Sequence, residues 1–124
     1  MAVGPLGQIH ISVTDLDASI AFYHDVLGIP LLFRVPGMPM AFLRSGDVRL
    51  YLGVPESAEF TSRCVLYFTV DDIEAEHARL TGEHGVAFDG PPHVVHEDGT
   101  TVLRMAFCRD PDGHHVGLME ESAV

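Results

Sequence analysis

Residues 9–18 read IHISVTDLDA and residues 66–75 read LYFTVDDIEA, so one pattern of apolar, polar and acidic positions occurs twice. The two stretches are 57 positions apart, and Gly28 and Gly85 are separated by the same offset. Further along, Met-Ala-Phe occurs at residues 40–42 and again at residues 105–107. Because similarity at a nearly fixed spacing is typical of repeated architecture, we infer that the chain contains two copies of one structural unit.

Each copy is predicted to begin with a strand that leads into a helix. Apolar and polar residues alternate over residues 8–13 and 64–70, which favours strands with one buried face. An aspartate follows each strand, and its carboxylate can accept hydrogen bonds from the free amides of a helix's first turn. We expect the first helix to end at Gly28 and the second near Gly82 or Gly85, because glycine often follows a helix C-terminus.

Three further strands are predicted in each copy. They are expected at residues 31–35, 40–44 and 48–54 in the first copy, and at residues 86–95, 102–108 and 114–119 in the second. A hairpin turn at residues 45–46 would set Phe42 opposite Arg49 and Met40 opposite Tyr51.

The sequence therefore predicts an α+β protein with two tandem βαβββ modules, at about residues 5–54 and 63–122, joined by a linker at about residues 55–62. We expect residues 1–124 to form one domain, because a domain usually holds roughly 100 to 200 residues. Apolar residues make up 47% of the chain and charged residues 20%, which is typical of a folded globular protein.

The charge of the chain argues against two classes of partner. Seven Lys and Arg residues against 18 Asp and Glu residues give a formal net charge of −11. A surface of this sign repels phosphate groups, so we expect neither nucleic acid nor a membrane as partner. Cys64 and Cys108 form no C-x-x-C pair, which predicts two free, buried thiols. The chain lacks a long apolar run and a secretion signal, so we expect a cytoplasmic protein.

The two faces of the central strands differ in composition, since residues two apart in a strand share a face. Aliphatic stripes suited to packing under the helices are Ile9, Ile11 and Val13, then Val48, Leu50 and Leu52, then Leu66, Phe68 and Val70, and finally Val116 and Leu118. The opposite face is rich in Tyr, Phe, Met and His, which is typical of a small-molecule cleft. A solvated sheet or a dimer interface has a similar composition, so these interpretations stay open. The ligand-binding residues predicted on this face are Gln8, His10, Met40, Phe42, Arg49, Tyr51, Val65, Tyr67, Met105, Phe107, His115, Gly117 and Met119.

Two motifs carry a resemblance to a known family. Residues 15–28 follow D-x-x-x-S-x-x-F-Y-x-x-x-L-G, and residues 109–114 read RDPDGH. On these motifs and the repeat, the chain resembles the vicinal oxygen chelate superfamily, which includes glyoxalase I, bleomycin-resistance proteins and extradiol dioxygenases. The resemblance covers nearly the whole chain. It implies paired βαβββ modules that form an open, barrel-like cup, and a homodimer whose clefts are shared between chains.

The resemblance also implies where a metal would bind. Metal-dependent members are similar in placing one ligand on each of four strands. The matching positions in this chain are Gln8, Tyr51, Val65 and Gly117. Because Val65 and Gly117 have no donor side chain, we expect no metal and no other cofactor. A displaced metal site around His10 and His115 stays open as an alternative.

We predict a protein that sequesters an antibiotic or another aromatic natural product without converting it, as in drug resistance or self-protection. Tyr51, Tyr67 and Phe42 can stack on planar groups of a hydrophobic, aromatic or cationic ligand. Gly117 would leave room for the ligand where the family's carboxylate stands.

Three other functions stay open. A metal-free isomerase, cyclase or hydrolase could use a cleft histidine near a tyrosine as general acid or base. A lyase or dioxygenase could act on a small oxygenated substrate through a rearranged metal site. The chain could also be a scaffold without a ligand. No Ser-His-Asp or Cys-His signature is found, so no catalytic residue is assigned.

Overall fold

The computed structural model describes residues 2–124, and the chain divides into two compact units, Met1–Arg63 and Cys64–Val124. Each unit consists of one four-stranded sheet with helical turns between its first and second strands. None of the helices in the described part of the chain has the length and apolar character that crossing a membrane requires. The units are described one at a time below.

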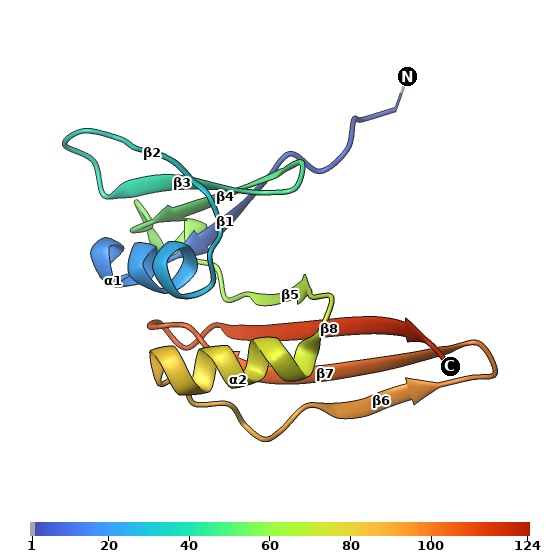
Figure 1. Ribbon diagram of the computed structural model, residues 1–124. Helices are drawn as coiled ribbons and strands as arrows, with labels where there is room; N and C mark the ends of the chain where they lie inside the picture. Colours follow the sequence, from blue (N-terminus) through green and yellow to red (C-terminus); the bar gives the residue numbers. More distant parts are fainter. Residues whose placement is uncertain (1) are drawn as a thin grey trace. The chain divides into compact units, whose positions relative to one another are not determined.

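The first unit contains one sheet with strand order β1-β4-β3-β2. Its elements are β1 (Gln8–Ser12), α1 (Leu16–Ile20), the π-helical segment η1 (Ala21–Val26), β2 (Leu31–Arg34), β3 (Met40–Ser45), β4 (Val48–Gly53) and the 3-10 turn η2 (Ala58–Phe60). Strands β1 and β4 are parallel, whereas β4, β3 and β2 pair antiparallel. The parallel pair requires a crossover, and α1 with η1 forms part of it (Figure 1).

The second unit repeats this topology, with strand order β5-β8-β7-β6. Its elements are β5 (Val65–Thr69), α2 (Ile73–His84), β6 (His93–Glu97), β7 (Thr101–Arg109) and β8 (His115–Ala123). Strands β5 and β8 are parallel, and the remaining pairs are antiparallel. The predicted α+β class and the two tandem βαβββ modules are therefore confirmed.

Period-two alternation gives each sheet one buried face. In the first unit Ile11, Leu43 and Leu52 are fully buried, and Tyr23 of η1 is buried with them. In the second unit Val116 and Leu118 are buried, as are Ile73 and Leu80 of α2. Burying one such side chain stabilises the fold by about 1.5–3 kcal/mol, so these aliphatic stripes determine which face of each sheet turns toward the core.

Both helices begin as predicted, at an aspartate. The side chain of Asp15 accepts a hydrogen bond from the Ala18 amide at 3.1 Å, and Asp72 accepts from the Ala75 amide at the same distance. Helix α2 ends at Gly85, whose φ of 64° is in the left-handed region that favours glycine. The first helix differs from the expected regular helix, because the Leu27 amide donates to the Phe22 carbonyl, five residues back, and forms a π turn.

The strand predicted at residues 86–95 is shorter than expected, because β6 begins only at His93. Pro91 and Pro92 precede it, and proline has no amide hydrogen to donate to a strand ladder. The last strand is longer than the predicted 114–119, because β8 continues to Ala123 by pairing with the start of β7.

The predicted register of the β3–β4 hairpin is wrong by two residues. The turn consists of residues 46–47, with Gly46 at a φ of 58°, and Phe42 therefore pairs with Tyr51 instead of Arg49. Met40 likewise pairs with Gly53. A shift of two positions leaves every side chain on its predicted face, since faces alternate with a period of two.

A buried histidine fixes the start of β5. His114 is buried, and its Nδ1 accepts a hydrogen bond from the Cys64 amide at 2.9 Å. We predict that His114→Ala lowers the free energy of unfolding by about 1–2 kcal/mol, because the buried amide loses its acceptor. His114→Asn offers an acceptor oxygen near the position of Nδ1, so it should recover part of that loss. Urea denaturation followed by circular dichroism measures both, and equal losses would contradict this assignment.

The thiol of Cys108 is predicted to be inert in the folded protein. Burial raises the pKa of Cys108 to about 11, and the negative charges of Asp89 and Asp110 add to the rise. At pH 8 only about one such thiol in a thousand is ionised. In a Cys64→Ser variant we expect no prompt reaction with a thiol reagent at pH 8, a rate that increases with pH up to about 11, and full reaction in denaturant. Fast labelling of the folded variant at pH 8 would contradict this expectation.

Candidate functional site

Four rings form a continuous row across the face of the first sheet that is turned away from its core stripe. They belong to His10, Tyr51, Phe42 and Phe33, one from each of the neighbouring strands β1, β4, β3 and β2. Successive ring centroids are 4.5 Å, 5.0 Å and 5.0 Å apart. We call these four residues the ring platform. Offset or tilted rings at such spacings attract one another.

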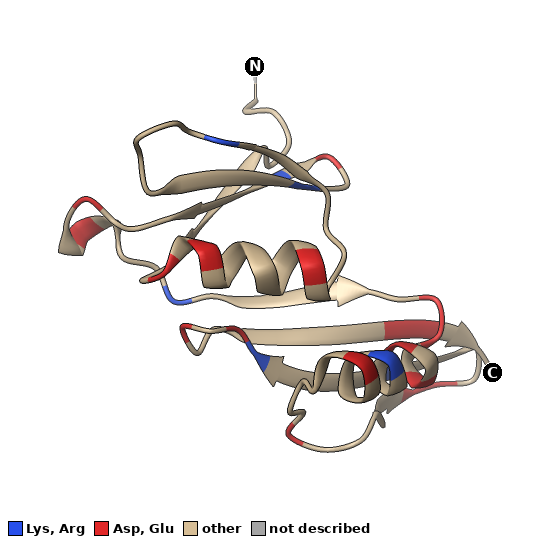
Figure 2. Cartoon of the chain, turned by 60° about the vertical axis from the view of Figure 1, so that its left-hand side comes forward, with Lys and Arg blue, Asp and Glu red and all other residues tan. Residues whose placement is uncertain are grey.

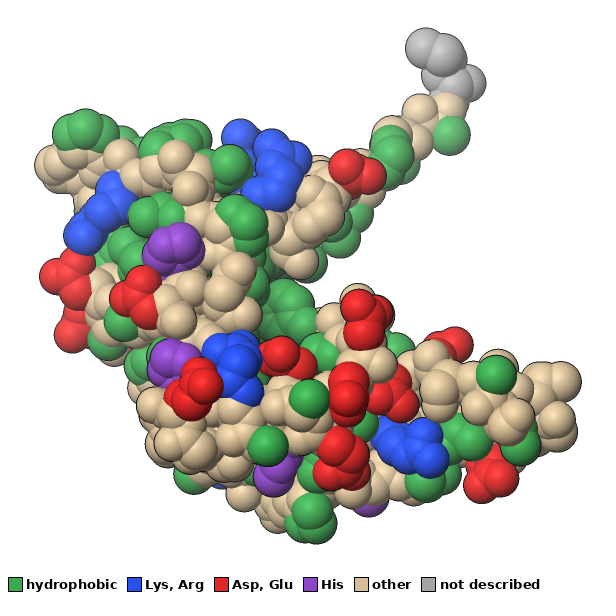
Figure 3. All heavy atoms as spheres, in the orientation of Figure 1, with side chains coloured by type: hydrophobic (Ala, Val, Ile, Leu, Met, Phe, Trp, Pro, Cys, Tyr) green, Lys and Arg blue, Asp and Glu red, His purple; other side chains and the backbone are tan. Residues whose placement is uncertain are grey.

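Strand register explains why the rings meet. His10 pairs directly with Tyr51, Tyr51 with Phe42, and Phe42 with Phe33. Directly opposed side chains have Cβ atoms about 4.5–5.5 Å apart, so each ring lies beside the next. Figure 3 shows hydrophobic side chains at the surface over β2 and β3. Phe33 of β2 is 49% exposed.

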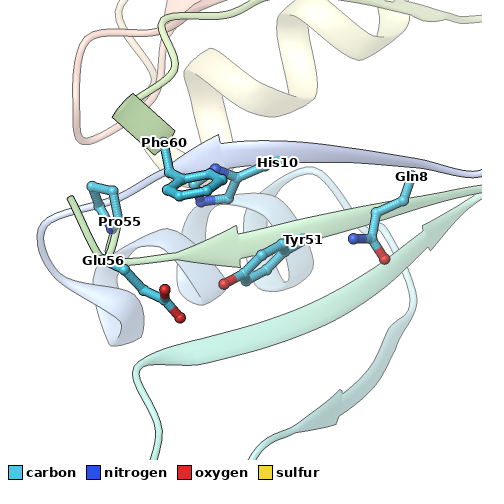
Figure 4. A pocket seen from close by; sticks show the side chains of 6 residues that line it. All are labelled: Gln8, His10, Tyr51, Pro55, Glu56 and Phe60. Carbon is cyan, nitrogen blue, oxygen red and sulfur yellow. The ribbon is translucent and has the colours of Figure 1, made fainter. Parts of the chain in front are cut away.

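A pocket of about 300 Å³ opens at the His10 and Tyr51 end of the platform. Its lining residues are Gln8, His10, Tyr51, Pro55, Glu56 and Phe60. The last three belong to the segment that follows β4, so this segment forms one wall of the pocket (Figure 4). In Figure 4, Tyr51 lies between Glu56 and Gln8, with its hydroxyl directed to the Glu56 side.

Two serines attach that wall to strand β1. The Ser62 amide donates to Ser12 Oγ at 2.7 Å, and the Ser12 amide donates to Ser62 Oγ at 3.1 Å. Ser62 Oγ also donates to the His10 carbonyl at 2.9 Å. We call this arrangement the serine clamp. It holds the chain two residues beyond Phe60, which is a ring of the pocket wall.

Contacts with the backbone of Gly53 also fix the rings at the pocket. The Nε2–H of His10 donates to the Gly53 carbonyl at 3.2 Å. The Tyr51 ring lies against the Cα of Gly53, where a Cβ would overlap it. Glycine at position 53 therefore allows Tyr51 to take its place in the row.

Arg49 and Gln8 form the polar edge of this face. The Nε–H of Arg49 donates to Gln8 Oε1 at 2.8 Å, and the Arg49 guanidinium carbon lies 5.1 Å from the centroid of the Phe42 ring. Gln8 Oε1 accepts from Arg49 and keeps a second lone pair, and the Gln8 amide N–H groups can donate to a ligand.

The corresponding face of the second unit is built differently. Tyr67 and Phe107 meet edge to face at a centroid distance of 5.7 Å, and they lie over Gly117. A Cβ at position 117 would be 2.9 Å from Phe107 and 3.0 Å from Tyr67. The prediction that Gly117 leaves room for a ligand is therefore wrong, because the chain's own rings fill this space.

The structure distributes the predicted site residues over both units. Gln8, His10 and Tyr51 line the pocket, and Phe42 and Arg49 contact pocket residues directly. Met40 pairs with Gly53 on the neighbouring strand. The predicted residues of the second unit are Val65, Tyr67, Met105, Phe107, His115, Gly117 and Met119, none of which lines this pocket. Their role in binding stays a prediction.

Sequence reasoning missed Phe33, Pro55, Glu56 and Phe60. Phe33 was within a predicted strand, and its place opposite Phe42 depends on a register shift between Leu31 and Phe33 in the β2–β3 pairing, which the sequence pattern does not reveal. The other three were assigned to the linker. Phe60 alone carried a signal in the sequence, because it is an aromatic residue in a polar linker. In the structure Phe60 is 61% exposed.

Comparison with known proteins places this geometry in a family. The family model described as the Glyoxalase/Bleomycin resistance protein/Dioxygenase superfamily matches residues 6–118. The chain belongs to this superfamily. It is 34% identical over 127 aligned residues to a lactoylglutathione lyase of Haemophilus influenzae, with 90% of this chain and 89% of that protein covered.

Two solved structures are also similar. One is TnmS3, described as an antibiotic binding protein from Streptomyces sp. CB03234, with 30% identity, a TM-score of 0.78 and coverage of 98% of this chain and 99% of that chain. The other is a glyoxalase/bleomycin resistance protein from the same organism, with 31% identity, a TM-score of 0.67 and coverage of 92% and 98%.

The residues of this chain do not fit the metal that members of the superfamily use. Of the four corresponding positions, Val65 and Gly117 offer no donor atom. The Gln8 oxygen already accepts from a guanidinium, whose positive charge opposes a cation beside it. Across residues 2–124 no group of three or more His, Cys, Asp and Glu side chains could hold a metal ion.

The serine clamp generates a prediction about the pocket wall. We expect Ser62→Ala to release residues 55–61 from β1, because two of the hydrogen bonds that join them to β1 need the Ser62 hydroxyl. Hydrogen exchange measured by mass spectrometry should then become faster in this segment. Ser57→Ala is the matched control, since the Ser57 hydroxyl makes no hydrogen bond within the described chain. Equal exchange in both variants would show that the clamp does not hold the wall.

Proposed function

We propose that this protein binds a small planar aromatic molecule, such as an antibiotic, and sequesters it in the cytoplasm without converting it. The observation that carries the proposal is the ring platform, whose His10 and Tyr51 end lines a pocket of about 300 Å³. Ligand pockets usually measure about 300–1,000 Å³, so this one suits a ring system of modest size. Stacking on preformed rings favours a flat ligand without requiring the protein to rearrange.

The chemistry of the pocket favours binding over turnover. His10 uses its Nε2–H on the Gly53 carbonyl, so this nitrogen is engaged by the backbone and not by a substrate. General acid–base catalysis needs a titratable group within hydrogen-bond reach of the substrate and a second group that orients it. Two of the four positions where metal-dependent relatives place ligands, Val65 and Gly117, lack donor atoms, so we propose that this chain belongs to a metal-free branch of the superfamily.

Similarity to TnmS3 supports the same proposal. That protein is described as antibiotic binding, and it matches this chain over nearly its full length at 30% identity. We further propose that residues 1–124 form one ligand-binding domain, that the protein is a homodimer, and that Tyr67 in the second unit also contacts a ligand. Light scattering of the purified protein tests the dimer.

A second candidate is a glyoxalase-like lyase or isomerase. The observation in its favour is 34% identity to a lactoylglutathione lyase. Against it, a lyase of this kind would have to act here with Val65 and Gly117 in place of donor residues. Turnover of a small oxygenated substrate by purified protein would favour this candidate.

The proposal is tested by titration with daunorubicin, a planar polycyclic antibiotic, followed by mass analysis of the recovered ligand. We expect saturable binding and an unchanged mass. Tyr51→Ala should weaken binding by about threefold to tenfold, because one aromatic stacking contact is worth about 0.5–1.5 kcal/mol. Tyr51→Phe keeps the ring and should bind as the unchanged protein does. A converted ligand, or equal affinity in the Ala variant, would refute the proposal.

A further inference from the structure

The pocket carries a negative charge on one side. Of its six lining residues, Glu56 is the only one with a carboxylate. Within residues 2–124 no Lys, Arg or His forms an ion pair with Glu56, and no hydrogen bond engages its side chain. In Figure 4 the Tyr51 hydroxyl is directed to the Glu56 side of the pocket, and this charge is available to a ligand.

The other side of Tyr51 carries hydrogen-bond donors instead of a carboxylate. Gln8 offers amide N–H groups there, and its oxygen accepts from Arg49. The Arg49 guanidinium lies beyond Gln8, over the Phe42 ring and outside the pocket lining. Donor groups and positive charge are therefore at one end of Tyr51, and a free carboxylate is at the other.

We infer that the ligand is a planar ring system with a positively charged nitrogen, and that Glu56 is the residue that selects this charge. The inference rests on the proposed function, because it names the ligand class of the same pocket. A ring cation bound in the pocket beside Tyr51 and His10 is attracted by the Glu56 carboxylate. A hydrogen-bond acceptor at the far end of the ligand would meet the Gln8 amide.

The charge of the whole protein must be separated from the effect of Glu56. With a net charge of −11, the chain attracts any cation weakly, and Figure 2 shows acidic residues along both α1 and α2. Glu59 provides the control. It is in the same segment, is exposed, and does not line the pocket. Glu56→Gln and Glu59→Gln change the net charge equally, so only the position of the lost charge differs.

The test uses three probes that share the acridine skeleton at pH 8. These are 9-aminoacridine, which is a cation, acridone, which is neutral, and acridine-9-carboxylate, which is an anion. We expect 9-aminoacridine to bind about threefold to fivefold more tightly than acridone, and the carboxylate to bind most weakly. Added salt should reduce the preference, since an exposed ion pair is screened. The fluorescence of each probe reports its binding.

In Glu56→Gln the preference for 9-aminoacridine over acridone should fall to about onefold to twofold, with the acridone affinity unchanged. Glu59→Gln should keep the preference of the unchanged protein. If both variants keep the preference for 9-aminoacridine, or lose it equally, Glu56 does not select charge and the inference is wrong. In that case, acridone binding that depends on Tyr51 leaves the proposed function intact. If none of the three probes binds, both the inference and the proposed function fail.

Discussion

The direct pairing of ring-bearing residues across four strands is the constraint on which the site depends. His10, Tyr51, Phe42 and Phe33 are each opposite the next in the strand ladder, so backbone hydrogen bonds fix the ring spacing at 4.5–5.0 Å. The aliphatic stripe on the other face fixes this register in turn, because a slip of one residue would bury the rings and expose the core. The same packing that stabilises the unit therefore preorganises its aromatic surface.

The repeat also reveals how the two units have diverged. By pairing, Tyr67 and Gly117 in the second unit correspond to His10 and Tyr51 in the first. Removing the side chain at position 117 lets Tyr67 and Phe107 close over the backbone, whereas Tyr51 keeps a row of rings extended. Pro91 and Pro92 delay the start of β6, so no β6 residue pairs with Phe107, whereas Phe33 of β2 pairs with Phe42. One topology thus supports two surfaces of different chemistry.

Most of the fold could be predicted from the sequence, because it depends on signals that are local. Alternation identified the strands, the aspartate caps identified the helix starts, and the offset of 57 identified the second module. The hairpin register could not be predicted reliably, since a turn at residues 45–46 and one at residues 46–47 differ little in local sequence. The extent of β6 depended on its pairing with β7, which a pattern of apolar residues does not reveal.

The site was predicted only where it follows strand parity. Gln8, His10 and Tyr51 were found because each is on the face opposite the aliphatic stripe. The wall that turns this open face into a pocket comes from an irregular segment, and its place depends on the long-range hydrogen bonds between Ser12 and Ser62. A sheet face alone can stack on any flat molecule, whereas a wall with a free carboxylate limits the size and charge of what fits. We therefore propose that the selectivity of this protein resides in the segment that forms this wall, which carries no periodic signal.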